Sequence, residues 1–414
     1  MNADKRSLLW LLICGAMPVM TTAILSPALP GLQKAFQSQQ DIAMLSRLVL
    51  TTPALAIALG AGAMGILLDR WGRVPVLTLA LILFAFAGAH GLWAEDLHQL
   101  IAARFLFGLG VAGVMTGAAT LLADLYRGED LRRMVGLQAA LLGCWGIVSQ
   151  LLAGWLAEYH WRGPFALYLV ALLLGLTLPW APRTEVAPAL GVPQEAGPSM
   201  HFALIMQVLM LALLSSVGMS LFSLILVHGP LYFSQAAGIG PRGTAFLISS
   251  MTAASSLASL SLALWKRRMR GVSWVALGFL AMAAGLALIG LLPRMRGLLP
   301  GLVLVGLAIG TIVPCIHAWT AQLVQARHRG RTLGVLTSIN YIGQFLTPFW
   351  VHAWLDRTGD RVLFIGSAGF SLLAAGGLVM IQWIERMRQV EAEPSVQPMP
   401  VRESKTRPTD RLGS

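Results

Sequence analysis

Gly65-Ile-Leu-Leu-Asp-Arg-Trp-Gly-Arg73 joins two long apolar runs, one ending near residue 68 and the next beginning near residue 75. Only 12% of the 414 residues are charged, yet Asp69, Arg70 and Arg73 fall within five positions. Gly65 and Gly72 accompany these charges, and glycine is the residue that best tolerates a tight turn. The stretch therefore predicts a short polar turn between two apolar helices.

The composition of the whole chain predicts an integral membrane protein. Hydrophobic residues make up 56% of the sequence and the mean hydropathy is +0.71, which is more apolar material than one water-soluble core can hide. Apolar segments of roughly 20 residues, the length of a helix that crosses a bilayer, recur as far as residue 384. We expect an all-α membrane protein with twelve spans, at 8–32, 44–68, 75–93, 100–124, 134–157, 163–181, 204–232, 242–265, 272–292, 298–322, 333–355 and 362–384.

The chain divides into two parts at a proline-containing polar stretch between Pro182 and His201. We expect a six-helix bundle at 1–181, a cytoplasmic linker at 182–203, a second bundle at 204–384 and a disordered cytoplasmic tail at 385–414. The two halves are weakly alike at an offset of about 198 residues, which predicts pseudo-symmetry. Two similar bundles around a central site are typical of secondary transporters.

Basic residues predict the orientation in the membrane. With the N-terminus inside, 21 of the 30 Lys and Arg residues fall on the cytoplasmic side, eight fall on the other side and Arg104 lies within a span. Because cytoplasmic loops are enriched in Lys and Arg, we expect both termini to be cytoplasmic. The net charge of +12 is then a topology signal, and the expected partner is the lipid bilayer rather than a nucleic acid. We expect a monomer.

The turn and the twelve spans resemble the major facilitator superfamily, whose signature is Gly, three residues, Asp, Arg, any residue, Gly and Arg. Gly65, Asp69, Arg70, Gly72 and Arg73 match it, and Val74 replaces a second basic residue often found next. A carboxylate here can cap a neighbouring helix or pair with Arg73, so the cluster is interpreted as a conformational latch. The resemblance implies Asp124 as a further acidic partner. The alternative is that both arginines only follow the positive-inside rule.

An arginine inside a span provides a second point of resemblance. Arg104, Gly108 and Gly110 match a pattern of proton-coupled members, although Phe107 replaces the usual Gln. A charge within a membrane helix is costly and should face a wet cavity or a carboxylate. Arg104 is therefore a candidate for a proton relay or a substrate-anion contact. The alternative is an interfacial arginine whose charge reaches outward to water.

Further polar residues within the spans are candidates for the substrate and proton pathway. Asp41 and Arg47 are six positions apart, on different helix faces. Arg47 and Arg104 together predict an electropositive cavity and an anionic substrate, whereas an Arg47 directed at lipid headgroups is the alternative. The other candidates are Gln150, His317, Asn340 and Gln344.

The four remaining candidates differ in the argument for them. Gln150 follows Ser149 where many drug antiporters have a Gly-Pro pair, so a polar contact replaces a helix break. Asn340 and Gln344 are one turn apart and share a face. His317 can titrate near neutral pH, or can be a hydrogen-bonded packing residue. We expect no strongly buried carboxylate in the second bundle.

The sequence contains no glycine-rich nucleotide loop, paired metal-ligand motif or sizeable soluble domain. We therefore expect neither an enzyme nor an ATP-driven pump, with no metal or cofactor and the proton gradient as the energy source. The expected function is export of a small organic molecule, such as a drug or a carboxylate siderophore, across the inner membrane by proton antiport. Proton-coupled uptake, a non-transporting sensor or scaffold, and an intramembrane hydrolase are the alternatives.

Overall fold

The computed structural model describes residues 3–176, 202–264 and 271–392, and every regular element in these ranges is helical. Most of the expected linker, up to residue 201, and the expected tail from residue 393 lie outside the described residues. Helix α13 continues to Ala392, so the tail predicted to begin at residue 385 starts as helix. All-α architecture follows from the membrane, where a helix satisfies its own backbone hydrogen bonds.

The first half begins with a broken helix. Its pieces are α1 (Ala3–Ala16), η1 (Met17–Met20), η2 (Ser26–Ala28) and α2 (Leu29–Ala35). A proline lies at the first turn of η1, of η2 and of α2, where its missing N–H is tolerated and a preceding helix is interrupted. The remaining elements are α3 (Ile42–Trp71), α4 (Arg73–Ala89), η3 (His90–Leu92), α5 (Leu97–Leu125), α6 (Gly128–Tyr159), η4 (Gly163–Leu169) and α7 (Val170–Leu176).

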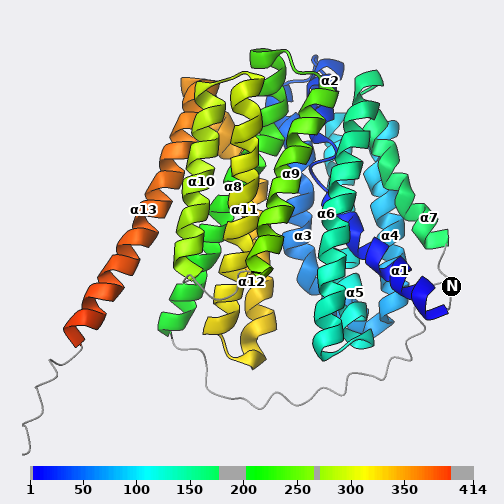
Figure 1. Ribbon diagram of the computed structural model, residues 1–414. Helices are drawn as coiled ribbons and strands as arrows, with labels where there is room; N and C mark the ends of the chain where they lie inside the picture. The colour runs from blue at the N-terminus through cyan, green and yellow to red at the C-terminus, as the bar shows by residue number, and fades with distance from the viewer. Residues whose placement is uncertain (1–2, 177–201, 265–270, 393–414) are drawn as a thin grey trace, which may run out of the picture.

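The second half contains six longer helices. They are α8 (Phe202–Ala237), α9 (Pro241–Leu264), α10 (Gly271–Leu291), α11 (Met295–Leu323), α12 (Ala326–Thr358) and α13 (Asp360–Ala392). Figure 1 shows this bundle, coloured green to red, beside the blue and cyan helices of the first half. Within the described ranges, nine helices are long and apolar enough to cross a membrane. The broken first helix, the short η4 and α7 segment and the more polar α12 occupy the other three expected positions.

Each half has its own hydrophobic core. One cluster includes Phe84, Phe107 and Tyr168 of the first half, and the other includes Phe279 and Phe364 of the second. Few buried residues join the core of the opposite half. The two bundles therefore pack as separate bodies that touch along a narrower contact.

We call this contact the inter-half interface; its main parts are α3 against α12 and α6 against α9. Loops and helix ends near Asp41 mark one end of the molecule, the Asp41 end, and the opposite end carries Asp69. Hydrogen bonds between the halves lie from the Asp41 end to the middle of the bundles, at Ser26–Leu226, Arg47–His228, Gln150–Thr252, Glu158–Arg242, Tyr159–Arg242, Ala58–Ser338 and Met115–Tyr341.

The glycines at the inter-half interface also pack closely at the Asp41 end and loosely toward the Asp69 end. A Cβ added to Gly154 of α6 would lie 2.1 Å from Ala245 Cβ of α9, so the two helices touch there through their backbones. Near the Asp69 end, a Cβ on Gly62 or Gly65 of α3, or on Gly334 of α12, meets no described atom within 4 Å. The halves are closed together at the Asp41 end and separated toward the Asp69 end.

Replacing Gly154 by Leu is expected to separate the halves at the Asp41 end. The new side chain overlaps Ala245 and the Pro241 carbonyl, and overpacking of this kind costs about 1–3 kcal/mol. The unfolding midpoint of the purified protein in detergent, followed by tryptophan fluorescence, should fall. Gly377→Leu is the matched control, because no described atom lies within 4 Å of its added Cβ. Equal midpoints for the two variants would contradict the close contact of α6 with α9.

Candidate functional site

The turn at the Asp69 end depends on one glycine. Helix α3 ends at Trp71 and α4 begins at Arg73, so Gly72 alone connects them. Gly72 has φ 87°, in the left-handed region that residues with a Cβ rarely adopt. This single residue reverses the chain and directs Arg73 toward the neighbouring helix α5.

Arg73 forms an ion pair with Asp124, one residue before the end of α5. The two side chains are 16% and 37% exposed, so the pair lies at the boundary between buried and open surface. The position of Arg73 near the carboxyl end of α5 also suits the negative pole of that helix. The pair joins α4 to α5 within the first half.

Asp69 differs from the expectation that it caps a helix or pairs with Arg73. Asp69 and Arg70 are exposed, and Asp69 has no hydrogen bond or ion pair with any described residue. The partner of Arg73 is Asp124, because Gly72 turns the Arg73 side chain away from α3. Gly65, one turn earlier in α3, faces open space. The carboxylate of Asp69 is thus open to solvent in this conformation.

Arg104 lies at the centre of the first half and is fully buried. Its Nε donates a hydrogen bond to the Val49 carbonyl at 3.1 Å, and its Nη2 donates to the Thr21 carbonyl. The guanidinium lies over the Phe107 ring at 4.2 Å and the Tyr168 ring at 5.4 Å, within the range of cation–π attraction. Arg104 therefore links the broken first helix to α3 and α5.

This position excludes an Arg104 that reaches outward to the membrane surface. The two glycines after Arg104 explain how the helices come close enough for its contacts. A Cβ at Gly108 would lie 2.5 Å from the Pro53 carbonyl of α3, and one at Gly110 would lie 2.7 Å from the Phe84 nitrogen of α4. The pattern of one arginine and two glycines packs three helices around one buried cation.

Arg47 is the second buried cation, with 4% of its surface exposed. The expectation that Arg47 points to lipid headgroups is therefore wrong. Its Nη2 lies 3.4 Å from Nδ1 of His228 on α8, across the inter-half interface. Its Nε and Nη1 have no hydrogen-bond partner in the described structure. Asp41 is exposed at the left-handed N-cap of α3, with φ 56°, and does not join Arg47.

Asp360 is a functional candidate that sequence reasoning missed. Its Oδ1 lies 2.8 Å from Nε2 of His228, and its side chain is 36% exposed. With this exposure Asp360 is not strongly buried, so it does not contradict the expectation that the second bundle lacks a strongly buried carboxylate. Asp360 follows Gly359 in a turn between two spans, so in the sequence it resembles an ordinary loop charge. Only its position against His228 distinguishes it.

Gln150 lies at the interface rather than free in a cavity. Its side-chain amide exchanges hydrogen bonds of 3.0 and 3.1 Å with the Thr252 hydroxyl of α9. Gln150 is 2% exposed, so this pair forms a buried polar contact between the halves. In the sequence, Gln150 falls where many drug antiporters have a Gly-Pro pair, so a polar amide occupies a position where a helix break is expected.

The remaining candidates lie on α11 and α12. Asn340 and Gln344 are each 6% exposed, and the Asn340 Oδ1 has no partner among the described residues. His317 is half-buried on α11, and its Nε2 is also without a described partner. The structure does not bring His317 to the Arg47 and His228 contact. An unpartnered buried polar atom is costly, so these groups are available to a ligand or to water.

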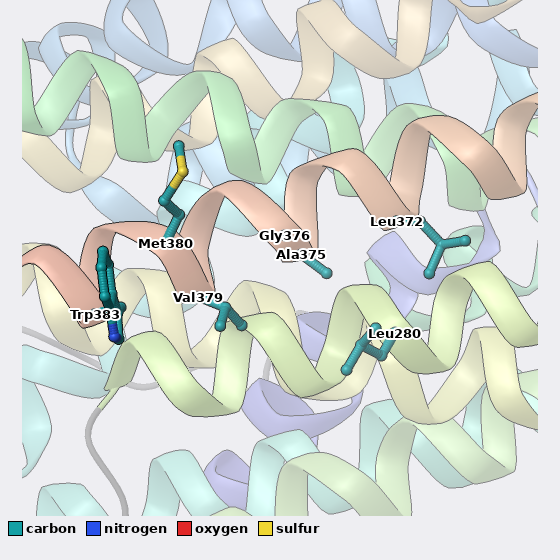
Figure 2. A pocket seen from close by; sticks show the side chains of 7 residues that line it. All are labelled: Leu280, Leu372, Ala375, Gly376, Val379, Met380 and Trp383. Carbon is teal, nitrogen blue, oxygen red and sulfur yellow. The ribbon is translucent and has the colours of Figure 1, made fainter.

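A surface groove of about 440 Å³ between α10 and α13 lies apart from these candidate residues. Figure 2 shows the side chains that line it, Leu280, Leu372, Ala375, Gly376, Val379, Met380 and Trp383. Its walls are almost wholly apolar and suit lipid. In the part of the chain that the structure describes, no group of three His, Cys, Asp or Glu residues could hold a metal ion.

The chain matches the model of the Major Facilitator Superfamily over residues 11–348. The fold is similar to the xylose transporter XylE from E. coli in its inward open conformation, with a TM-score of 0.72 and 15% identity over 90% of this chain and 94% of that one. At this identity the likeness concerns the fold alone.

Two curated relatives share shorter segments. The tetracycline resistance protein, class C, of Escherichia coli is 33% identical over 156 residues, covering 37% of this chain and 38% of the relative. The 4-hydroxybenzoate transporter PcaK of Pseudomonas aeruginosa is 33% identical over 135 residues, which is 30% of each chain. The chain thus matches about a third of the length of these relatives.

Asp69→Asn and Asp124→Asn are expected to have different effects. Asp124→Asn removes a formed ion pair and should lower the unfolding midpoint slightly, because a partly exposed pair contributes about 0.2–1 kcal/mol. Asp69→Asn should leave the midpoint unchanged but slow transport roughly ten- to hundred-fold, if the closed state has a charged hydrogen bond of about 1.5–3 kcal/mol. Thermal unfolding and vesicle transport measure the two effects. Parental transport by Asp69→Asn would exclude the latch role.

Arg104→Ala is expected to destabilise the first bundle. The substitution leaves the Thr21 and Val49 carbonyls without their donor, and each unsatisfied buried group costs about 1–3 kcal/mol. Arg104→Lys retains a cation and should recover part of the loss, although it lacks the planar fork of arginine. The check is the unfolding midpoint of both variants. If both variants have the same unfolding midpoint as the parent, Arg104 does not hold these helices together.

Proposed function

We propose, from the premise that this chain belongs to the Major Facilitator Superfamily, that the protein exports a small carboxylate-bearing organic molecule in exchange for protons. It is a multi-pass membrane transporter and not an enzyme. The proposal places it in the inner membrane as a monomer, with both termini in the cytoplasm and two bundles that rock about a central site.

One observation carries the cargo part of the proposal. Arg47 is a buried cation at the inter-half interface, and its Nε and Nη1 have no described hydrogen-bond partner. A guanidinium presents parallel N–H donors that match the two oxygens of a carboxylate. When the Asp41 end opens, these donors face the space between the halves and can bind such a group.

Export and proton exchange rest on the relatives and on the titratable groups. The match to a tetracycline resistance protein favours removal of an organic compound from the cell. His228 and Asp360 lie at the interface where the halves must separate, so proton binding there can be linked to movement. The Arg73–Asp124 pair and exposed Asp69 provide the latch at the opposite end.

A second candidate is uptake of an aromatic acid together with protons. The relative named as a 4-hydroxybenzoate transporter favours it, since its printed substrate is a carboxylate. Both candidates use Arg47 in the same way and differ in the direction of the proton relative to the cargo.

Purified protein in liposomes separates the two candidates. Radiolabelled 4-hydroxybenzoate and tetracycline are offered under pH gradients of either sign. Antiport predicts accumulation of the cargo in liposomes with an acidic interior, and symport predicts accumulation when the exterior is acidic. Protein-free liposomes and a protonophore are the controls. No protein-dependent flux under any gradient, for either compound or for a wider set of organic acids, would contradict the proposal.

Arg47→Gln is expected to weaken binding of the carboxylate cargo. Loss of a charged hydrogen bond of about 1.5–3 kcal/mol corresponds to roughly ten- to hundred-fold in Kd. Binding of the methyl ester of the same acid should change little, because an ester carries no charge for Arg47 to pair. Lys34→Gln is the matched control, since Lys34 is an exposed cation at the same end. Equal weakening of acid and ester would assign Arg47 a structural role.

A further inference from the structure

Three side chains at the Asp41 end form a continuous polar chain across the inter-half interface. Arg47 of α3 contacts His228 of α8 at 3.4 Å, and His228 contacts Asp360 of α13 at 2.8 Å. We call these residues the Arg47 triad. The Phe364 ring stacks against the imidazole, with the ring centroids 6.0 Å apart. The triad joins the halves through ionisable side chains in the interior, because Arg47 and His228 are both buried.

The geometry of the triad requires a neutral imidazole. A guanidinium has only N–H donors, so the Nδ1 of His228 must present its lone pair to Arg47 Nη2. The ring proton is then on Nε2, where it is donated to the Asp360 carboxylate. In this arrangement Nδ1 can only accept a hydrogen bond from Arg47, and Nε2 can only donate one to Asp360. A second proton on Nδ1 would set an N–H against the N–H of Arg47 and remove the contact.

Protonation also creates repulsion between the halves. An imidazolium 3.4 Å from a guanidinium places two positive charges side by side at a buried position, where the attraction or repulsion of charges is stronger than in water. The same charge strengthens the contact of His228 with Asp360, which belongs to the same half. The proton therefore weakens the contact across the interface while it stabilises the contact within the second bundle.

A solvent route leads to the triad from the Asp41 end. A cavity of about 370 Å³ lies between the ends of α8, α10 and α13, and Asp360, Arg361 and Tyr232 are among the residues that line it. Asp360 thus has one side toward this open cavity and the other toward His228. The cavity brings water to the carboxylate that stabilises the imidazolium. Because Nε2 already carries the ring proton, the added proton binds Nδ1 when the Arg47 contact breaks transiently.

Other charged groups near the triad do not replace its members. Asp356 of α12 contacts His352 at 3.5 Å, and Arg361 of α13 lines the same cavity as Tyr232 and Asp360. Tyr232 donates its hydroxyl proton to the Ile289 carbonyl at 3.1 Å. On neighbouring elements, Lys34, Arg294 and Arg296 are exposed, and Arg242 of α9 contacts Glu158 and Tyr159.

The backbone next to His228 is also held by the first half. Ser26 of η2 donates a hydrogen bond of 2.6 Å to the Leu226 carbonyl, two residues before His228. This segment of α8 is therefore clamped by η2 and α3 together. Removal of the Arg47 contact leaves Ser26 as the remaining hydrogen bond between η2 or α3 and this segment in the described structure.

We propose that the Arg47 triad is a proton-binding site whose protonation from the Asp41 end opens that end of the inter-half interface. The inference extends the proposed function, because the opening it describes is the step in which a transporter exposes its cargo site. Binding of the proton and the opening itself do not require cargo, so they can be measured apart from transport.

The experiment measures the distance across the Asp41 end as a function of pH in the absence of cargo. Spin labels are attached to cysteines at Ser38 and Gln235, two exposed positions on opposite halves, in a chain whose Cys14, Cys144 and Cys315 are replaced by serine. Between about pH 8 and pH 5, the range in which histidines titrate, the distance distribution should shift toward longer values as the pH falls.

His228→Gln should abolish this shift and keep the short distance throughout, because the glutamine oxygen can accept from Arg47 but binds no proton in this range. Asp360→Asn should move the opening to lower pH, since the imidazolium loses its negative partner. His98→Gln is the matched control, an exposed histidine at the same end that should open like the parent. Size-exclusion profiles confirm that each variant is folded.

Two results would overturn the proposal. One is a parental distance distribution that stays the same across this pH range, and the other is a His228→Gln variant that opens with pH as the parent does. Failure of the proposed cargo gives a different pattern, in which opening depends on pH but neither organic acids nor tetracycline are transported. Full proton-coupled transport by His228→Gln would refute the triad and leave the proposed function standing.

Discussion

Hydrocarbon offers no hydrogen-bond partners, so each polar group within the membrane must find one inside the protein. The two buried arginines show two responses to this constraint. Arg104 donates hydrogen bonds to two backbone carbonyls and lies over aromatic rings of its own half, with Nη1 left without a described partner, and it holds a broken helix against two intact ones. Arg47 is satisfied only in part, and its one hydrogen bond crosses to the other half. The first arrangement gives a rigid body, and the second gives a contact that can be broken.

The interface between the bundles is built from weak and reversible contacts. Its hydrogen bonds are few and scattered, such as Ser26 to Leu226 and Ser338 to Ala58, and the contact of α6 with α9 depends on Gly154. Large apolar side chains are instead concentrated within each bundle. Two stable cores with a modest contact between them are what rocking requires, because the contact can separate without unfolding either half.

The Asp69 turn and the Arg47 triad lie at opposite ends of this interface and have complementary states. In this structure the triad is formed and the halves meet at the Asp41 end, while Asp69 is exposed and Gly65 faces open space. The Arg73–Asp124 pair remains within the first half and does not depend on the second. In the proposed latch, closure of the Asp69 end gives Asp69 the partner that it lacks here, at the expense of the contacts at the other end.

The sequence by itself determined the membrane class, the all-α fold and the short turn at Gly72 between two apolar helices. These features depend on local composition and on periodic apolar runs, which can be recognised in the sequence without knowledge of tertiary contacts. Only the tertiary structure decided the partners of the charges. It placed Asp124 rather than Asp69 against Arg73, buried Arg47 rather than exposing it, and brought Asp360 to His228 from 132 positions away. Pairing of that kind is set by how helices pack, and helix packing depends on small residues and side-chain shapes that the hydropathy pattern does not encode.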